Sequence, residues 1–310
     1  TVDDIVTDVN IKSYFTNNSN FNDTTHFYGG LAGEVRAQDH TELAVNNVKI
    51  GGEMEIRIAS DHTMAGGLAA SYLQEGSGSS RIYVNGFELL KGFGLSSAGR
   101  KCSGMFTQIN DDTQRTDRTI LSMSNIVIHN GASLEFGENT DKPGGGWLGM
   151  VWNDVAPDEA GHCSIEGITI GDGGTAGDGP SLSAGGVFGG LVNTVTGRIQ
   201  LKNININNGI FNNNGAKKAG LLFCDGIDAL IEIDGYTIAG RTLGESGGNA
   251  SGAVQLTGGG SLDEIAAYNI GRNLNEAGDY ASGGIVNIIY DGFPADHKTY
   301  QNKVTKDTSD

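Results

Sequence analysis

Short apolar runs led by glycine recur along the chain. AGGLAAS at 65–71 is typical, with two glycines, one leucine, small residues and no charge. When the glycine before each run is taken as an anchor, successive anchors lie 32 to 42 residues apart. Self-similarity with a period in this range indicates a solenoid or a propeller. The anchors are Gly30, Gly67, Gly104, Gly146, Gly186, Gly220, Gly252 and Gly284.

A second pattern lies within the same units. It has six residues in the order apolar, any, small, apolar, any, apolar, as in VNNVKI at 45–50 and MSNIVI at 123–128. The small residue is Asn or Gly in every unit but the last, and these two residues most readily adopt a left-handed backbone. The pattern therefore predicts a strand, a corner and a second strand. The predicted corners are Asn47, Gly86, Asn125, Gly167, Asn203, Gly235 and Ala267.

These elements predict an all-β fold. The residues around each corner alternate as strands do, without the sustained apolar stripe of a helix. Each unit should hold three short strands: the glycine-led strand, one before the corner and one after it. We expect a right-handed single-stranded parallel β-helix of about eight coils. A four-stranded propeller blade is the competing architecture, but it needs another strand and hairpin turns where these units have a corner.

The repeats also divide the chain. Residues 1–28 match no repeat and are expected to form an N-terminal cap or extension. Residues 29–290 carry the β-helix repeats, and 291–310 form a polar C-terminal tail. In the glycine-led strand of AGGLAAS, Leu68, Ala70 and Tyr72 are expected to face the core, with Ala69 and Ser71 pointing outward.

The glycine-led runs carry a family resemblance. GGLAG at 29–33 and GGVFGGLVN at 185–193 resemble the GLUG-type repeats of bacterial surface proteins and adhesins. More broadly, the chain is similar to the pectate-lyase-like parallel β-helices, which include polysaccharide lyases, hydrolases, phage tailspikes and adhesins. The resemblance covers about residues 29–290 and implies a β-helix presented on a surface.

The composition limits the kinds of partner that the protein is expected to bind. The net charge of −17 argues against nucleic acid and against an anionic membrane surface, because both require a basic face. No run approaches the roughly 20 apolar residues of a membrane helix. The chain opens with Thr1 and shows no signal peptide, as expected of a mature or trimmed product. The three cysteines lack metal-ligand spacing and are expected to be buried small hydrophobes: Cys102, Cys163 and Cys224.

One carboxylate pair fits the chemistry of glycan-cleaving β-helices. Glu232 and Glu264 occupy equivalent positions one coil apart, close enough for acid/base glycoside hydrolysis. The competing interpretation is two solvated glutamates on a polar wall, which the absence of an aligned His, Arg or Lys favours. The sequence therefore favours a non-catalytic protein over an enzyme.

One loop suggests a calcium site. Asp172 and Asp178 lie in GDGGTAGDG, where carboxylate and backbone oxygens could hold Ca²⁺. A plain flexible loop is the alternative. The six histidines fall at scattered positions in the repeat, and no pair has metal-ligand spacing. Apart from calcium, no cofactor is expected.

The last coils suggest an interface. Outward positions of their glycine-led strands are apolar, and a continuous exposed apolar patch usually marks a contact surface. We therefore expect a non-catalytic extracellular structural or adhesive protein of a cell surface, filament or virion, which forms a homo-oligomer or larger assembly. The alternative is a carbohydrate-binding or polysaccharide-degrading β-helix, with glycans as partners. The predicted interface residues are Phe188, Val192, Leu222, Val254, Leu256, Val286 and Ile288.

Overall fold

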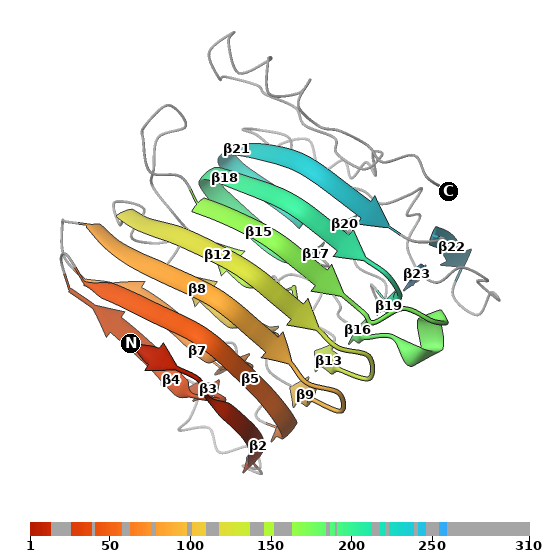
Figure 1. Ribbon diagram of the computed structural model, residues 1–310, viewed down its shortest axis with the longest axis horizontal. Helices are drawn as coiled ribbons and strands as arrows, with labels where there is room; N and C mark the ends of the chain where they lie inside the picture. The colour runs from red at the N-terminus through yellow and green to blue at the C-terminus, as the bar shows by residue number, and fades with distance from the viewer. Residues whose placement is uncertain are drawn as a thin grey trace, which may run out of the picture.

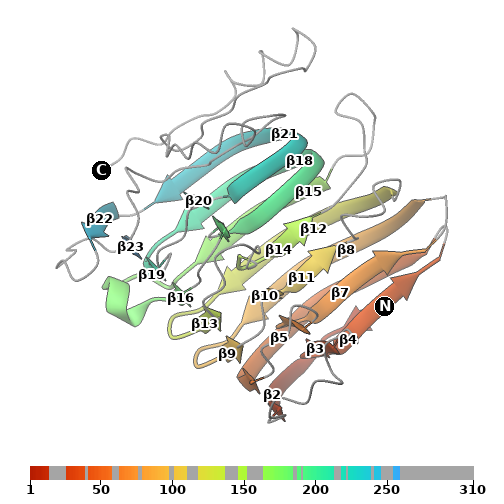
Figure 2. The same ribbon diagram turned by 180° about the vertical axis from the view of Figure 1, so that it is seen from behind.

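The protein is a parallel β-solenoid. Every strand pair that the structure describes is parallel. The described strands form three sheets of 18, three and two strands. The two ribbon views show successive coils stacked side by side (Figures 1 and 2). The computed structural model describes residues 1–13, 26–38, 41–57, 63–75, 79–97, 101–109, 118–136, 146–151, 163–183, 187–189, 191–212, 218–220, 223–238, 241–245 and 254–258.

One column of long parallel strands is the main element of the fold. Each of its members pairs in parallel with the next, so that they lie side by side from red to cyan in Figure 1. The short strand β1 (Val2–Asp3) precedes the first member and pairs with the same neighbour. The members are β2 (Val6–Ser13), β5 (Glu42–Ile56), β8 (Ser79–Leu89), β12 (Arg118–Ile128), β15 (Cys163–Ile170), β18 (Val192–Ile206) and β21 (Phe223–Ile238).

Shorter strands complete the coils in three further groups. The glycine-led group comprises β4 (Ala32–Ala37), β7 (Ala69–Gln74), β11 (Phe106–Ile109) and β14 (Gly149–Val151). After the long strands come β9 (Gly94–Ser97), β13 (Ser133–Phe136), β16 (Ser181–Ser183), β19 (Gly209–Asn212), β22 (Arg241–Glu245) and β23 (Val254–Gly258). The two small sheets comprise β3 (His26–Gly29), β6 (Thr63–Gly66) and β10 (Lys101–Ser103), and β17 (Val187–Gly189) with β20 (Lys218–Gly220).

Five of the seven predicted corners are confirmed by a positive φ. At Gly235 the pairing of β18 with β21 skips the corner residue, and Ala267 lies outside the described residues. Asn47, Asn125 and Asn203 have φ values of 51°, 56° and 51°, and Gly86 and Gly167 have 79° and 66°. These residues stack in one column. Asn125 Nδ2 donates at 2.8 Å to Oδ1 of Asn85, the residue before the corner Gly86 in the neighbouring coil. A left-handed backbone costs most residues about 1–2 kcal/mol, which explains why the corners with positive φ in the described part of the chain are Asn, Asp and Gly.

The column begins earlier than the sequence pattern predicted. Asp4 has a φ of 50° and accepts a hydrogen bond from Asn47 Nδ2 at 3.0 Å. The strands on either side of it pair with β5 in the register of the later repeats. VDDIVT at 2–7 is thus a further copy of the six-residue pattern, hidden because Thr7 stands where the other units have an apolar residue. Whether it also serves as a cap stays a prediction.

The expectation of three short strands in each coil is wrong. The strands before and after a corner form one continuous bent strand, because pairing skips only the left-handed residue: Ser124 faces Asn85 and Ile126 faces Phe87. A further short strand precedes the anchor glycine in the first three repeats: β3, β6 and β10. The coil that starts at Thr63 therefore contains four strands, β6, β7, β8 and β9.

The core is wider than alternation alone predicted. Leu68, Ala70 and Tyr72 are buried, as expected. However, Ala69 and Ser71, which were expected to point outward on the same strand, are also buried, and so are their register partners on β11, Phe106 and Gln108. At Gln108 the cover includes Lys101, whose Nζ donates to Gln108 Oε1 at 3.1 Å. The glycine-led strands in this part of the fold are thus enclosed on both faces.

One repeat anchor was placed wrongly. The anchor at Gly186 requires Phe188 to stack on Leu148, but the N–H of Leu148 donates to the carbonyl of Leu191. AGGVFGGLV contains two glycine pairs, and the chain turns after the second of them. The residues after this turn, Leu191 and Val192, are both fully buried.

The corner can be tested at Asn125, which is exposed. Asn125→Ala should lower the free energy of unfolding by about 1–2 kcal/mol, because alanine resists the left-handed backbone. Asn125→Gly should stay much closer to wild type, since glycine adopts that conformation freely. Urea denaturation followed by circular dichroism measures both, with Ser122→Ala on the same strand as control. Equal losses for the alanine and glycine variants would contradict this account.

Candidate functional site

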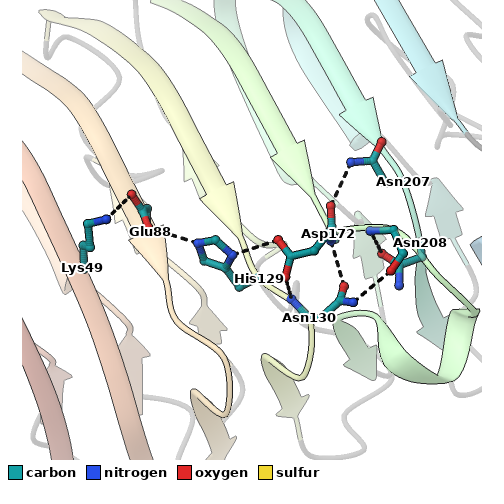
Figure 3. Close-up of polar contacts among 9 residues, drawn as sticks. Lys49, Glu88, His129, Asn130, Asp172, Asn207 and Asn208 are labelled. Carbon is teal, nitrogen blue, oxygen red and sulfur yellow. Dashed lines mark hydrogen bonds and ion pairs between the residues drawn. The ribbon is translucent and has the colours of Figure 1, made fainter.

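A row of charged side chains crosses the coils near the end of the six-residue pattern. It comprises Lys49, Glu88, His129 and Asp172 (Figure 3). Lys49 and Glu88 are register partners on β5 and β8. His129 follows β12 directly, and its N–H donates to the carbonyl of Leu89 at 3.0 Å. Asp172 follows β15 by two residues. The ladder thus brings side chains that are about 40 residues apart in sequence into contact.

The charges alternate along this row. Lys49 Nζ lies 2.8 Å from Glu88 Oε1, and His129 Nε2 lies 3.0 Å from Glu88 Oε2. On the other side of the ring, His129 Nδ1 lies 2.9 Å from Asp172 Oδ1. The row therefore reads cation, anion, imidazole, anion. Both nitrogens of the imidazole face a carboxylate, and His129 is partly buried, with 28% of its side chain exposed.

This arrangement favours a protonated imidazole. Partial burial lowers the pKa of His129, but hydrogen bonds and the charges of Glu88 and Asp172 raise it by more, so that it lies above its ordinary value. Partial burial likewise raises the pKa of Glu88, but Lys49 and His129 lower it below its ordinary value. For Asp172 the raising effect of burial is outweighed by hydrogen bonds from Asn130 and His129.

The geometry makes His129 a bridge. A general base needs one ring nitrogen directed at the proton that it removes, with the other oriented by a partner. Here both nitrogens are engaged by carboxylates, and two N–H groups are needed to donate to both. Metal ligation would likewise require a free ring nitrogen. His129 therefore links three neighbouring coils electrostatically.

Asparagines extend the bridge into the next turn. Asn130 N donates to Asp172 Oδ2 at 3.0 Å, and Asn130 Oδ1 accepts from Asp172 N at 2.8 Å. Asn208 is buried; its Oδ1 accepts from Gly173 N at 3.1 Å, and its Nδ2 donates to the carbonyl of Thr175 at 2.9 Å. The loop after β15 is thus tied on both sides to neighbouring coils (Figure 3).

The structure gives both predicted calcium ligands protein partners. Asp172 accepts from His129 and Asn130, whereas Asp178 Oδ2 accepts from Thr175 Oγ1 at 2.6 Å. Among the residues described, no group of three or more His, Cys, Asp or Glu side chains forms a possible metal site. The calcium site on Asp172 and Asp178 stays a prediction. Among the described residues, no further acidic side chain joins these two to form such a site.

The predicted carboxylate pair lies mostly outside the described residues. Glu264 is outside them, and Glu232 is described only by its backbone on β21, where it pairs with Gln200. The cysteine prediction is confirmed at two of three positions: Cys102 and Cys163 are buried free thiols. Burial raises the pKa of Cys102 to about 12, so the thiol is not a nucleophile. The side chain of Cys224 lies outside the described residues.

The predicted interface is corrected at one residue. Val192 is fully buried and cannot belong to an exposed face. Phe188 belongs to the β17–β20 sheet, whereas Val192 lies in the large sheet, because the turn after Gly189 separates them. Val254 and Leu256 are described by backbone alone, on β23. Leu222, Val286 and Ile288 lie outside the described residues.

A groove that the sequence patterns did not indicate lies on the face of β5, β9, β13 and β16. Its volume is about 350 Å³, and carboxylates and hydroxyls form its polar lining. Gly94 helps to hollow it, because a Cβ there would lie 3.4 Å from Ser133 Oγ. Glu55, Ser96 and Glu135 are successive register partners, so the two glutamates stand about 10 Å apart along the stack. The polar lining comprises Glu53, Glu55, Ser96, Ser133, Glu135, Ser181 and Ser183.

Comparison with family models, with curated proteins and with solved structures found no match to this chain. Within the described part of the chain, no helix has the length and apolar character needed to cross a membrane. The fold and the site geometry are therefore the observations from which function is inferred.

The His129 bridge should make stability depend on pH. The pKa of His129 is raised on folding, so its contribution is complete below the unfolded value of about 6.5 and is lost as pH rises through the folded value. Near pH 6, His129→Gln should lower the free energy of unfolding by about 0.5–1 kcal/mol.

The difference in the free energy of unfolding between wild type and His129→Gln should narrow as pH rises above the pKa of His129 in the folded protein. It should also narrow in acid, as pH falls through the lowered pKa values of Glu88 and Asp172. Urea denaturation of both proteins from pH 3 to pH 9 measures the profile. A constant difference between wild type and His129→Gln over this range would contradict the bridge.

Proposed function

We propose that the protein is a non-catalytic extracellular structural or adhesive solenoid, a component of a cell surface, filament or virion. The observation that carries the proposal is the in-register ladder of parallel strands with its column of left-handed corners. This ladder uses the repeated residues to build a long, stiff body with regular lateral faces. The GLUG-type and pectate-lyase-like resemblance of the glycine-led runs points in the same direction.

The chemistry of the polar row supports a structural role. The charged groups of this row bind one another across coils that the backbone ladder already joins. They are Lys49, Glu88, His129 and Asp172. A catalytic histidine would keep one nitrogen directed toward a substrate. We also propose that the solenoid is right-handed and continues to about residue 290, as about eight coils.

Assembly is proposed to use the apolar positions of the C-terminal coils. Without Val192, the positions that remain in the proposal are Phe188, Leu222, Val254, Leu256, Val286 and Ile288. A contiguous patch of this kind on a surface usually marks a contact with another molecule. A second copy of the chain is the simplest partner, because parallel coils present matching faces.

The native mass of the purified chain tests this proposal. Light scattering should give a mass above that of the 32.3 kDa chain, rising with concentration. Val286→Asp should lower the mass, whereas Glu166→Gln on the long-strand face should not. Circular dichroism checks that the variants remain folded. A monomer at every concentration would contradict assembly, and loss of mass in EDTA would support calcium at Asp172 and Asp178.

The groove favours a second candidate, carbohydrate binding. Its carboxylates and serine hydroxyls recur at the strand spacing of about 4.8 Å, so they can bond successive hydroxyls of an extended glycan. The separation of Glu55 and Glu135 is near the range found in inverting glycosidases. Arg57, which pairs with Glu55 at 2.5 Å, would be part of such a site.

Glycan binding can be tested separately from assembly. A polysaccharide panel screened by isothermal titration should reveal a ligand whose affinity falls at least about tenfold in Glu135→Gln, the usual effect of losing a charged hydrogen bond. Glu166→Gln, outside the groove, should bind like wild type. Product analysis by chromatography distinguishes cleavage from binding. No heat of binding to any member of a panel that includes neutral, acidic and amino sugars would count against this candidate.

A further inference from the structure

We propose that the outer edge of β2 is a self-association surface, on which the β2 strand of a second copy of the chain adds antiparallel about a twofold axis at Asn10. This contact uses the first coil that the structure describes, so it is separate from the assembly proposed above through the C-terminal coils. It rests on three features: an unpaired strand edge, incompletely covered apolar residues beside it, and opposite charges without partners on the strand itself.

β2 is an edge strand. Among the strands that the structure describes it pairs with β5 alone, and Figure 1 shows it as the outermost member of the column. The carbonyl of Ile5 accepts from Lys49 N, so the odd-numbered residues of β2 bond to β5. The even-numbered residues therefore turn their N–H and C=O groups toward the open edge, which is a template for a further strand.

Apolar side chains are incompletely covered at the same end of the stack. Ile11 and Val35 pack against the core but are only partly buried, whereas their register partners Met54 and Tyr72 are fully buried. On the outer face of β2, Val6 is 69% exposed, and in the described part of the chain no other large hydrophobic residue is exposed. A further strand layer on this edge would remove apolar surface from water.

Two charged residues of β2 indicate which strand fits. Asp8 and Lys12 are exposed, and they lie on one face of the strand with Asn10 between them. Neither forms a hydrogen bond or an ion pair with any residue that the structure describes. Glu55, the register partner of Lys12, is paired with Arg57 instead. A complementary strand offers a cation opposite Asp8 and an anion opposite Lys12, in reverse order along the chain, and β2 itself has that pattern.

One antiparallel register satisfies both charges. With Asn10 facing its own copy, Asp8 lies opposite Lys12 on each side of the axis, and Val9 faces Ile11 on the core side. The even-numbered residues then form the hydrogen-bonded pairs, with about six backbone hydrogen bonds between the copies. Centring the axis on Val9 or on Ile11 instead separates Asp8 from Lys12. Charges on an edge strand usually oppose pairing, but in this register each meets its opposite. Such an isologous contact closes as a dimer.

A charge swap tests the dimer. Light scattering is measured over a concentration series on the full chain with Val286→Asp, which removes the proposed C-terminal contact, and the mass should rise to about twice 32.3 kDa. In that background Asp8→Lys and Lys12→Asp should each raise the dissociation constant about tenfold or more, because two attractions become two repulsions. The double variant exchanges the two charges and should restore the dimer. Glu166→Lys, on the long-strand face, should leave the dissociation constant unchanged, and circular dichroism checks folding.

A cysteine on the axis gives a second measurement that does not need Val286→Asp. Residues of a hydrogen-bonded antiparallel pair have Cα atoms about 5.5 Å apart, a distance that a disulfide spans. Under mild oxidation, Asn10→Cys in the otherwise wild-type chain should give a covalent dimer on a non-reducing gel, whereas wild type and Ser122→Cys should not. The proposal is overturned if Asn10→Cys gives no covalent dimer, if the single reversals leave the dissociation constant unchanged, or if the double variant does not restore it. A failure of the C-terminal contact alone would appear as equal masses for wild type and Val286→Asp, with the β2 dimer retained.

Discussion

A left-handed residue at the same point of successive coils is the constraint on which this structure depends. In a parallel solenoid each strand satisfies its backbone through the coils on either side, so any bend must fall at the same register in all of them. Asp4, Asn47, Asn125 and Asn203 meet this requirement with positive φ, as do glycines in the coils between. A β-branched residue in the column would strain the backbone of its own coil. It would also displace the strand edge that pairs with the next coil.

The same register places side chains in rows. Residues that are register partners lie about 4.8 Å apart, so equal charges in one row repel at short range. In a chain of net charge −17, rows of carboxylates need cations between them. His129 suits such a place because a protonated imidazole has two N–H groups pointing in nearly opposite directions, toward the coils on both sides. A lysine at this point would carry its charge on one flexible end and could not align two carboxylates across the row in the same way.

Much of the fold was predictable because its constraint is local. Asn and Gly at one position of a six-residue pattern are visible in sequence, and the confirmed corners follow from them. The predictions that were wrong depend on contacts between segments that are distant in the sequence. AGGVFGGLV offers two equivalent glycine pairs, and only the backbone bond of Leu148 to Leu191 decides between them. Alternation assigns Phe106 and Gln108 to one side of a strand but does not reveal that other segments cover that side.

The candidate site was missed for a related reason. The pattern ends with the long strand, and His129 and Asp172 lie just beyond it, where turns differ in length from coil to coil. Continuing the register by two residues past Ile128 and Ile170 would have brought His129 and Asn130 beside Asp172. The spacing of the histidines from one another carries no signal here, because the partners of His129 are carboxylates one coil away. Groove residues such as Ser96 and Glu135 were invisible because the short strands after the turn were not expected.

Unequal repeat lengths and a strict ladder are compatible because they act on different parts of the coil. Closing a longer loop costs little additional entropy, about 0.6 kcal/mol for each doubling of its length, so the turn after β15 can be long without disturbing the strands. A long loop, however, gains no support from the ladder and has to be fixed by side chains. Here Asn208 and Asp172 supply that support from opposite sides, one through neutral hydrogen bonds and one through charge. Variation in such a scaffold is therefore tolerated in the loops, and a few polar residues are enough to hold a long loop in place.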